Sequence, residues 1–318
     1  MTARYLTESD VTSLLDLPTA ITLVEEAFRQ LALEKADNQP RVRASAPGIM
    51  LHTLSAAAEY LSTVGLKSYT TTKSGAKFHV LLYDGQTGAL TAMIEANRLG
   101  QLRTGAASGV ATQYMARRDA ADVGLLGTGF QAHTQLEAVC HVRRIRRVDV
   151  FSRDVGRREE FARAMSQRLD VEVTPVHSPD EAVDEKDTII TATTSRTPTF
   201  DGRSLAEGTH INAVGSNSLR RAELDSDAIR RSDIIVCDSI EQCQREAGDF
   251  NQALELGVTD WRLMHELSAV VAGHQSGRSS DEQVTLFKSV GLGIEDIAVG
   301  AHILERAIDE GIGQELPF

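Results

Sequence analysis

A glycine-rich turn between a short apolar run and a helical stretch constrains the fold of this chain more than any other feature. The run DVGLL at residues 122–126 leads directly into Gly127, Thr128, Gly129, Phe130, Gln131 and Ala132. This is the G-x-G-x-x-G/A pattern in its required place, after a strand and at the start of a helix. Gly127 permits the tight turn, Gly129 lets the backbone approach a pyrophosphate, and Ala132 lets the helix pack closely on the strand. The segment therefore predicts a dinucleotide-binding site.

The pattern that follows this turn supports the same interpretation. Further short apolar runs alternate with helical segments, at residues 148–151, 171–173, 188–192, 210–214 and 234–237. Such alternation is typical of βαβ units and a parallel sheet. The predicted fold class is therefore α/β, with a Rossmann dinucleotide-binding domain over residues 118–293.

The first third of the chain has a different pattern, typical of an α+β unit. Residues 18–35 carry apolar side chains with a helical period. Strands are expected from residue 42 and at 49–54, 66–72, 79–84 and 89–95, the last two forming a hairpin, and a helix at about 104–117. A final helix at about 293–310 is expected to return to this unit. The predicted first domain is residues 1–117, completed by about 294–318.

The end of the second Rossmann strand bears on the choice of cofactor. An NAD enzyme usually has an acidic residue there, which binds the ribose 2′-hydroxyl. Here the strand at 148–151 is followed by Ser152 and Arg153, with Arg157 as a possible second contact. Because Arg binds phosphate with a planar fork, this end suits a 2′-phosphate. We predict NADPH as the cofactor, with NADH weaker; the alternative is that these are surface arginines without a role.

Composition excludes several classes of partner. The 318 residues suit two domains, and the formal net charge of −12 argues against nucleic acid or an anionic membrane as a partner. No apolar stretch is long enough for a membrane span, and residues 1–5 do not resemble a signal peptide. Cys140, Cys237 and Cys243 lack metal-ligand spacing, so no metal site is predicted. They are expected to be reduced thiols of a cytoplasmic protein.

Several segments outside the turn resemble the ornithine cyclodeaminase/mu-crystallin family. They are LRTGAASGVAT at 102–112, GLK at 65–67, INAVGSN at 211–217, ELD at 223–225 and FKSVG at 287–291, and they occur in family order. The resemblance implies a nicotinamide-dependent enzyme whose first domain binds the substrate and forms a homodimer through its sheet. It also implies that the residues at Arg41, Lys67 and Arg103 hold the substrate carboxylate, which agrees with the bidentate contacts that fix a small anion.

The resemblance places further side chains at the site. Thr104, Thr193, Val214 and Lys288 are expected near the cofactor, and Lys67 and Asn217 at the reacting centre. Arg43 lies two residues after Arg41 and could replace it on the same strand face. His52 could enter the same pocket and protonate a substrate nitrogen; the alternative is a structural histidine.

One departure from the family pattern concerns the type of reaction. Family cyclodeaminases have an Asp where this chain has Asn217. A carboxamide cannot accept a proton as a carboxylate does, so deamination with ring closure loses its evident base. Reduction of a preformed C=N bond loses much less, and ketimine reductases that resemble mu-crystallin also lack this Asp.

The resulting prediction is NADPH-dependent reduction of a cyclic α-imino acid. Δ1-pyrroline-2-carboxylate giving L-proline is the first choice, followed by the six-membered piperideine analogue. One alternative is an ornithine cyclodeaminase or an alanine dehydrogenase-like enzyme acting on an amino acid. A second is a non-catalytic NADPH-binding protein of the crystallin type.

Overall fold

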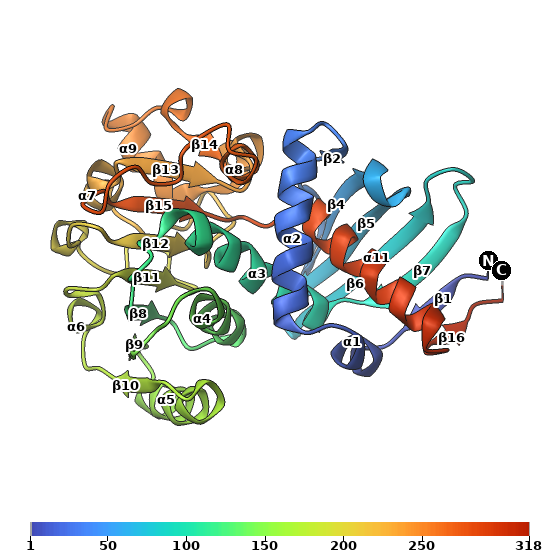
Figure 1. The fold of residues 1–318 in the computed structure, drawn as a ribbon, viewed down its shortest axis with the longest axis horizontal. Helices are drawn as coiled ribbons and strands as arrows, with labels where there is room; N and C mark the ends of the chain where they lie inside the picture. Colours follow the sequence, from blue (N-terminus) through green and yellow to red (C-terminus); the bar gives the residue numbers. More distant parts are fainter. Residues whose placement is uncertain (1, 318) are drawn as a thin grey trace. The chain divides into compact units, whose positions relative to one another are not determined.

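The computed structural model describes residues 2–317, which form two compact units (Figure 1). Unit 1 extends to Ala106 and resumes at Gly291, whereas unit 2 comprises Ala107–Val290. The division lies within helix α3 (Asn97–Met115). It therefore precedes the end of this helix, where the sequence pattern had placed the boundary.

Unit 1 contains an eight-stranded, mostly antiparallel sheet. The strand order is β16-β1-β7-β6-β5-β4-β2, and β3 pairs with β4. The predicted hairpin is present as the antiparallel pair of β6 and β7. The strands are β1 (Arg4–Leu6), β2 (Ala36–Asn38), β3 (Val42–Ala46), β4 (Ile49–Ala58), β5 (Thr63–Thr72), β6 (Gly75–Asp84), β7 (Leu90–Glu95) and β16 (Gln314–Glu315).

Two helices of unit 1 cover one face of this sheet. Helices α2 and α11 lie side by side on it, in blue and red in Figure 1. Because strand side chains alternate between faces, Leu54 and Leu82 are buried under the helices, whereas Leu51 and Val64 are exposed on the other face. The helical segments are α1 (Glu8–Leu14), α2 (Leu17–Ala32), the short η1 (Glu59–Leu61) and α11 (Gly293–Asp309).

Unit 2 contains an eight-stranded parallel sheet in the order β10-β9-β8-β11-β12-β15-β13-β14. The predicted α/β fold class with a Rossmann-type unit is confirmed. Both faces of this sheet are buried, since Val123 and Leu125 belong to one hydrophobic core and Leu126 to another. The strands are β8 (Asp122–Leu126), β9 (Arg147–Phe151), β10 (Glu172–Pro175), β11 (Thr188–Thr191), β12 (His210–Ala213), β13 (Ile234–Cys237), β14 (His265–Glu266) and β15 (Thr285–Lys288).

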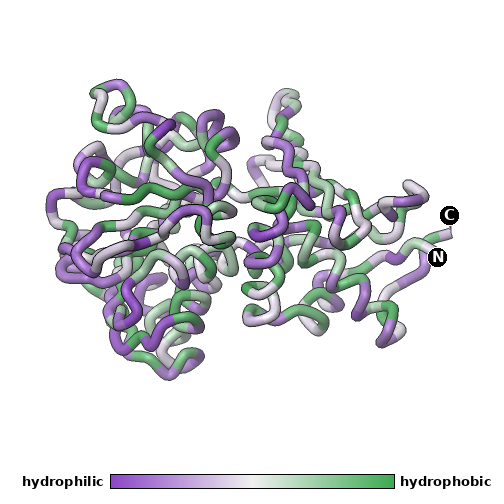
Figure 2. The backbone as a smooth tube through the Cα atoms, turned by 45° about the horizontal axis from the view of Figure 1, so that its top comes forward, coloured by the Kyte–Doolittle hydropathy of each residue, from purple (hydrophilic) through white to green (hydrophobic). Residues whose placement is uncertain are grey.

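The helices of unit 2 connect these strands. Figure 2 shows many of its hydrophilic stretches along the outer loops. The helical segments are α4 (Phe130–Val142), α5 (Val155–Leu169), α6 (Pro179–Val183), η2 (Gly202–Ser204), α7 (Ser226–Arg231), α8 (Ile240–Glu246), η3 (Gly248–Phe250), α9 (Asn251–Glu255), η4 (Trp261–Leu263) and α10 (Leu267–Val271). Within residues 2–317, no helix combines the length and the hydrophobicity that a membrane crossing requires.

Two of the differences from the sequence prediction concern longer elements. Helix α3 begins at Asn97 rather than near residue 104, because the carboxylate of Glu8 accepts hydrogen bonds from the N–H groups of Asn97 and Arg98. Strand β15, which was not predicted, lies between β12 and β13 and pairs with both. Both features depend on contacts between residues distant in sequence.

Candidate active site

The glycine turn follows β8 and leads into α4 as the sequence predicts. Gly127 has a φ of +106°, and a Cβ at this position would lie 2.4 Å from the carbonyl oxygen of Ala192. Gly129 precedes the first turn of α4 without a side chain to cap it, and an added Cβ there would meet no described atom within 4 Å. Ala132 is fully buried. The turn is therefore tight at Gly127 and open at Gly129, which fits a pyrophosphate at the helix N-terminus.

The topology of unit 2 gives this turn its neighbours. Strand β8 lies between β9 and β11, where the chain direction of the crossovers reverses, and ligands bind at such a switch point. Thr128, Phe130 and Gln131 continue the turn into the exposed or half-buried start of α4. Thr193 follows β11. The carbonyl oxygen of the preceding residue, Ala192, lies next to Gly127.

A buried glutamate joins two of these loops. Glu223 accepts hydrogen bonds from the N–H of Thr193 at 2.7 Å, from the N–H of Gly215 at 2.7 Å and from the hydroxyl of Thr191 at 3.0 Å. Burial raises the pKa of Glu223, while the nearby Lys288 opposes the shift. Glu223 thus connects the ends of β11 and β12, next to Val214. The sequence reasoning quoted this residue as part of a motif but assigned it no role.

The position of Lys288 does not agree with the predicted contact to the cofactor. Its side chain is completely buried, with Nζ 2.7 Å from Asp249 Oδ2 and 2.9 Å from the carbonyl oxygen of Ser216, to which it donates. Asp249 in turn accepts from the N–H of Glu223 at 2.6 Å. Lys288 therefore stabilises the loop after β12 from inside the protein. Asn217 lies on the exposed part of that loop.

The end of β9 carries the three residues predicted to bind a 2′-phosphate. Ser152 and Arg153 follow the strand, and Arg157 is exposed in the first turn of α5. The acidic side chains nearby are used for other contacts, because Asp149 pairs with a lysine within unit 2 and Asp154 caps α5. Arginines therefore outnumber carboxylates at this end of the strand, and Asp154 also pairs with Arg157 at 3.6 Å.

A third arginine at this end was not predicted. Arg158 is buried, its Nη1 donates to the carbonyl oxygen of Ser152 at 3.2 Å, and its guanidinium lies 5.4 Å from the centre of the Phe151 ring. The only sequence signal for this role is the position of Arg158 in the first turn of a helix that follows a strand. Arg158 holds the backbone that presents Ser152 and Arg153.

Unit 1 gathers five ionisable side chains, Arg41, Lys67, Arg103, Glu295 and Asp296, which we call the charge cluster. Arg103 donates from Nη1 to Glu295 at 2.8 Å and from Nε to Asp296 at 3.1 Å. Lys67 Nζ donates to the same oxygen of Asp296 at 2.7 Å. The two carboxylates have no solvent-exposed side-chain surface. Three cations and two anions leave the ionised cluster with one net positive charge, which suits one carboxylate.

Two glycines make room for these cations. A Cβ on Gly291, whose φ is +83°, would lie 2.6 Å from Arg103 Nη1, and one on Gly100 would lie 2.7 Å from Lys67 Nζ. Arg41 is buried and donates to the carbonyl oxygen of Gly291 at 3.2 Å. The carbonyl oxygen of Gly100 also accepts a hydrogen bond from the hydroxyl of Thr104 at 2.6 Å. Thr104, which the sequence predicts near the cofactor, therefore belongs to unit 1.

The pKa values of Lys67 and Arg103 are shifted in opposite directions. Burial lowers the pKa of Lys67 to about 8, although the carboxylate of Asp296 opposes the shift and the positive charge of Arg103 adds to it. For Arg103 burial also acts downward, but Asp296 and Glu295 outweigh it and raise the pKa. Arg103 is thus always charged, whereas Lys67 can exchange a proton near neutral pH.

His52 does not have the properties of a proton donor. Its Nδ1 accepts a hydrogen bond from Arg43 Nε at 3.2 Å, and its Nε2 lies 3.1 Å from the hydroxyl of Thr71. Burial and the charges of Arg43 and Arg41 lower its pKa to about 4. The ring is therefore neutral at physiological pH, and we correct the predicted acid role to a structural one.

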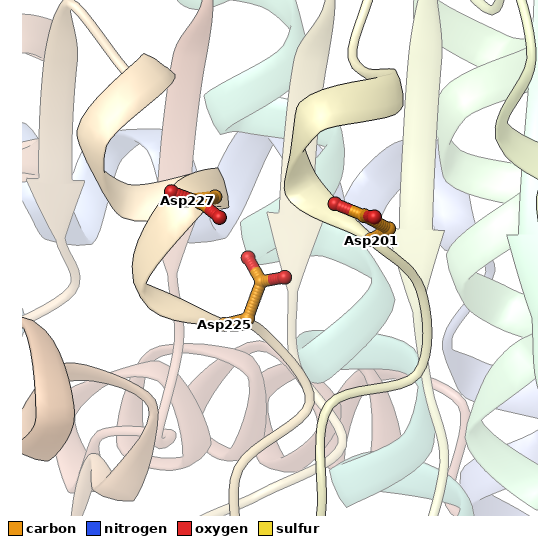
Figure 3. A group of neighbouring side chains, drawn as sticks. All are labelled: Asp201, Asp225 and Asp227. Carbon is orange, nitrogen blue, oxygen red and sulfur yellow. The ribbon is translucent and has the colours of Figure 1, made fainter.

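Three aspartates of unit 2, Asp201, Asp225 and Asp227, lie close together in Figure 3. Each already has protein partners. Asp201 pairs with Arg203, Asp225 caps α7, and Asp227 pairs with Arg230. The cluster is therefore explained by local helix and turn contacts.

Comparisons with known proteins give a consistent result. The model of the ornithine cyclodeaminase/mu-crystallin family matches residues 1–311. A Δ1-pyrroline-2-carboxylate reductase of Bacillus cereus (strain ZK / E33L) is 37% identical over 269 residues, which cover 82% of each chain. The structure of the Δ1-pyrroline-2-carboxylate reductase of Thermococcus litoralis with NADH and L-proline is similar, with a TM-score of 0.94, 36% identity, and coverage of 98% of this chain and 100% of that one. An archaeal alanine dehydrogenase dimer with bound NAD also has a TM-score of 0.94, with 32% identity and full coverage of both chains.

Proposed function

Because this chain belongs to the ornithine cyclodeaminase/mu-crystallin family, we propose that it reduces a cyclic α-imino acid with NADPH, and that Δ1-pyrroline-2-carboxylate is converted to L-proline. The observation that carries this proposal is the buried charge cluster. Arg103 and Lys67 are held by fully buried carboxylates, and the cluster keeps one surplus positive charge. Such a cluster is costly to bury unless it binds an anion, and a small imino acid offers one carboxylate.

The chemistry of this reaction assigns a task to each cation. When bound, the nicotinamide supplies a hydride to the imine carbon, and one proton must reach the nitrogen to complete the amine. Arg103 stays charged and orients the substrate carboxylate, with Lys67 and Arg41 as further contacts. Lys67 supplies the proton from Nζ and regains one from solvent, as its position against Asp296 and its pKa of about 8 allow.

Asn217 favours reduction over deamination. A cyclodeaminase must remove an amino group, which calls for a base, whereas this position holds a carboxamide. The buried charge cluster also argues against a non-catalytic NADPH-binding protein, which has no use for a carboxylate site. The likeness to an archaeal alanine dehydrogenase keeps that reaction as a second candidate.

Steady-state assays with four substrates test the proposal. We expect NADPH oxidation with Δ1-pyrroline-2-carboxylate, with L-proline as the product, and slower oxidation with the piperideine analogue. Ornithine should release no ammonia, and alanine should support little NAD⁺ reduction. Ammonia release from ornithine without pyrroline reduction would replace the proposal with a cyclodeaminase, and faster alanine oxidation would replace it with a dehydrogenase.

The reaction should lose rate as the pH rises through about 8. Burial lowers the pKa of Lys67 to this value, so the charged form that donates the proton is present below pH 8 and lost above it. We expect kcat/KM for the imino acid to fall about tenfold per pH unit on that limb. In Lys67→Arg, kcat/KM should be lower at every pH but should no longer fall between pH 8 and pH 10. An unchanged limb in Lys67→Arg would assign it to another group.

We propose that the cationic end of β9 selects NADPH over NADH. Arg153→Asp should raise the Kd for NADPH at least about thirtyfold and change that for NADH by less than about threefold, because only NADPH carries the 2′-phosphate. Arg163→Asp, the same charge change at an exposed site further along α5, is the matched control. Titration of both nucleotides measures the two constants. Equal losses for the two nucleotides in Arg153→Asp would contradict the assignment.

We propose that the uncovered face of the unit 1 sheet forms a homodimer. Val42, Ile49, Leu51 and Val64 are all at least 40% exposed there, and their register places them on the side opposite α11. Leu51→Glu should shift the chain toward monomer in light scattering, since a two-fold interface would bury two added charges. Leu263→Glu, at an exposed leucine of unit 2, should leave the mass unchanged. If Leu51→Glu formed a dimer as stable toward dissociation as the wild-type dimer, this face would be excluded as the dimer interface.

A further inference from the structure

A row of three rings stands beside the charge cluster on the inner face of the unit 1 sheet. His52, Tyr69 and Phe78 are cross-strand neighbours on β4, β5 and β6. The rings of His52 and Tyr69 are stacked with centroids 4.2 Å apart and an interplanar angle of 3°, and those of Tyr69 and Phe78 are 4.9 Å apart. Two residues along β5 from Tyr69, on the same face, is Lys67. Tyr69 and Phe78 are half-buried, so part of the row is accessible.

Cations border this row at both ends. Lys67 Nζ lies 5.5 Å from the centre of the Phe78 ring. At the other end Arg43 donates to His52, and the charges of Arg43 and Arg41 both act on that ring. The histidine is neutral, so the row offers flat, uncharged surface between positive groups.

We propose that this aromatic row is the subsite for the carbon skeleton of the substrate, and that it selects a neutral, flat ring over a chain that ends in an ammonium group. The proposal rests on the reductase function above and names the substrate class of the same site. A ligand whose carboxylate is held by Lys67 has its remaining atoms next to Phe78 and Tyr69. An unsaturated five- or six-membered ring can pack against such rings.

The charges around the row explain the discrimination against diamino acids. With its carboxylate held at the charge cluster, ornithine would extend its distal ammonium along the row toward Arg43, which contacts the far ring, His52. Like charges at short distance in a partly buried site repel strongly. The ring of a cyclic imino acid has no such group. The row therefore acts against an open-chain diamino acid independently of Asn217.

The first test removes one flat ring and compares two substrates. Phe78→Leu should lower kcat/KM for Δ1-pyrroline-2-carboxylate about tenfold, because a stacked or edge contact between rings is lost. For the small imine formed from pyruvate and ammonia, which has no ring, the change should be less than about twofold. Tyr60→Leu is the matched control, because it removes a half-buried ring of unit 1 that lies in η1, outside the row. Tyr69→Leu provides a second variant with the same expected ratio.

The two substrates separate the possible outcomes. A fall in the ratio of the two kcat/KM values, with NADPH binding unchanged, supports the subsite. An unchanged ratio, or equal loss of both activities in Phe78→Leu and Tyr69→Leu, overturns it while leaving the reductase function in place. If the wild-type protein reduces neither imine, the proposed function fails and the subsite with it.

The second test measures the discrimination by charge. L-Ornithine should inhibit the wild-type protein at least about tenfold more weakly than L-proline. In Arg43→Gln this difference should become smaller, because one repelling charge is removed. Equal inhibition by the two amino acids in the wild-type protein would overturn the charge argument.

Discussion

Replacing Arg103 with methionine should lower kcat/KM for the imino acid at least about a thousandfold. Arg103 is the cation of the charge cluster that contacts both buried carboxylates, Glu295 and Asp296. Its loss removes the charged partner of the substrate carboxylate and leaves two anions near the place where a third must bind. A thousandfold corresponds to about 4 kcal/mol, within the range for truncating one member of a buried charged pair. Steady-state kinetics of purified Arg103→Met measures the loss.

The same substitution should also destabilise the fold, and a second variant separates the two effects. Breaking a buried ion pair by removing one partner costs about 3–5 kcal/mol. Adding Glu295→Gln to Arg103→Met removes one unpaired charge, so the Tm should recover in part while kcat/KM stays low. Arg103→Lys keeps the charge but not the fork, and should retain an intermediate rate. Activity of Arg103→Met within about threefold of wild type would show that Arg103 does not hold the substrate.

Gly127→Ala and Gly129→Ala should both abolish tight cofactor binding, but only the first should destabilise the protein. A methyl group at Gly127 would lie 2.4 Å from the Ala192 carbonyl oxygen, on a backbone with φ of +106°. We expect a loss of about 2–4 kcal/mol in the free energy of unfolding. At Gly129 the same methyl group meets no described atom within 4 Å, so the folded protein should tolerate it.

The methyl group introduced by Gly129→Ala should instead weaken cofactor binding. If the pyrophosphate lies against this backbone, Gly129→Ala should raise the Kd for NADPH at least about a hundredfold, which corresponds to about 2.7 kcal/mol. Thermal unfolding without cofactor and titration with NADPH measure the two effects separately. A Gly129→Ala protein with unchanged Kd would contradict the placement of the pyrophosphate at this turn.

The sequence predicts those parts of the fold whose chemistry is local. The turn at Gly127 and Gly129 needs only a strand before it, a helix after it and two residues without side chains, and all of these are adjacent in the chain. The alternation of apolar runs similarly indicates the parallel sheet of unit 2, and the fold class is confirmed. The family itself could also be predicted, from motifs that occur in the right order, and it is confirmed.

Other features depend on distant residues and could not be predicted. The residue pattern of the last helix is typical of a helix with one apolar face, yet Glu295 and Asp296 in its first turn are fully buried. They are buried because Lys67 and Arg103 reach them from elements about 190 to 230 positions away in the chain. Nothing in the local pattern distinguishes such acids from the solvated acids common in first turns.

The basic segment at residues 143–147 shows the same limitation. Its pattern is typical of a solvated helix end. Arg143, however, donates to the carbonyl oxygens of Thr112, Ala116 and Arg117, and so satisfies the C-terminal end of α3. A guanidinium that caps another helix has the same sequence signature as one in solvent. Lys288 differs from its prediction for a related reason, since its partner Asp249 belongs to a separate element.

A crystal structure of this protein with L-proline and NADP⁺ tests the central claim most directly. We predict that the proline carboxylate accepts hydrogen bonds from Arg103 and Lys67, and that its ring lies against Tyr69 and Phe78. The claim would be contradicted if proline bound with its carboxylate beyond hydrogen-bond distance of both cations, while Lys67 and Arg103 kept only their contacts with Asp296 and Glu295.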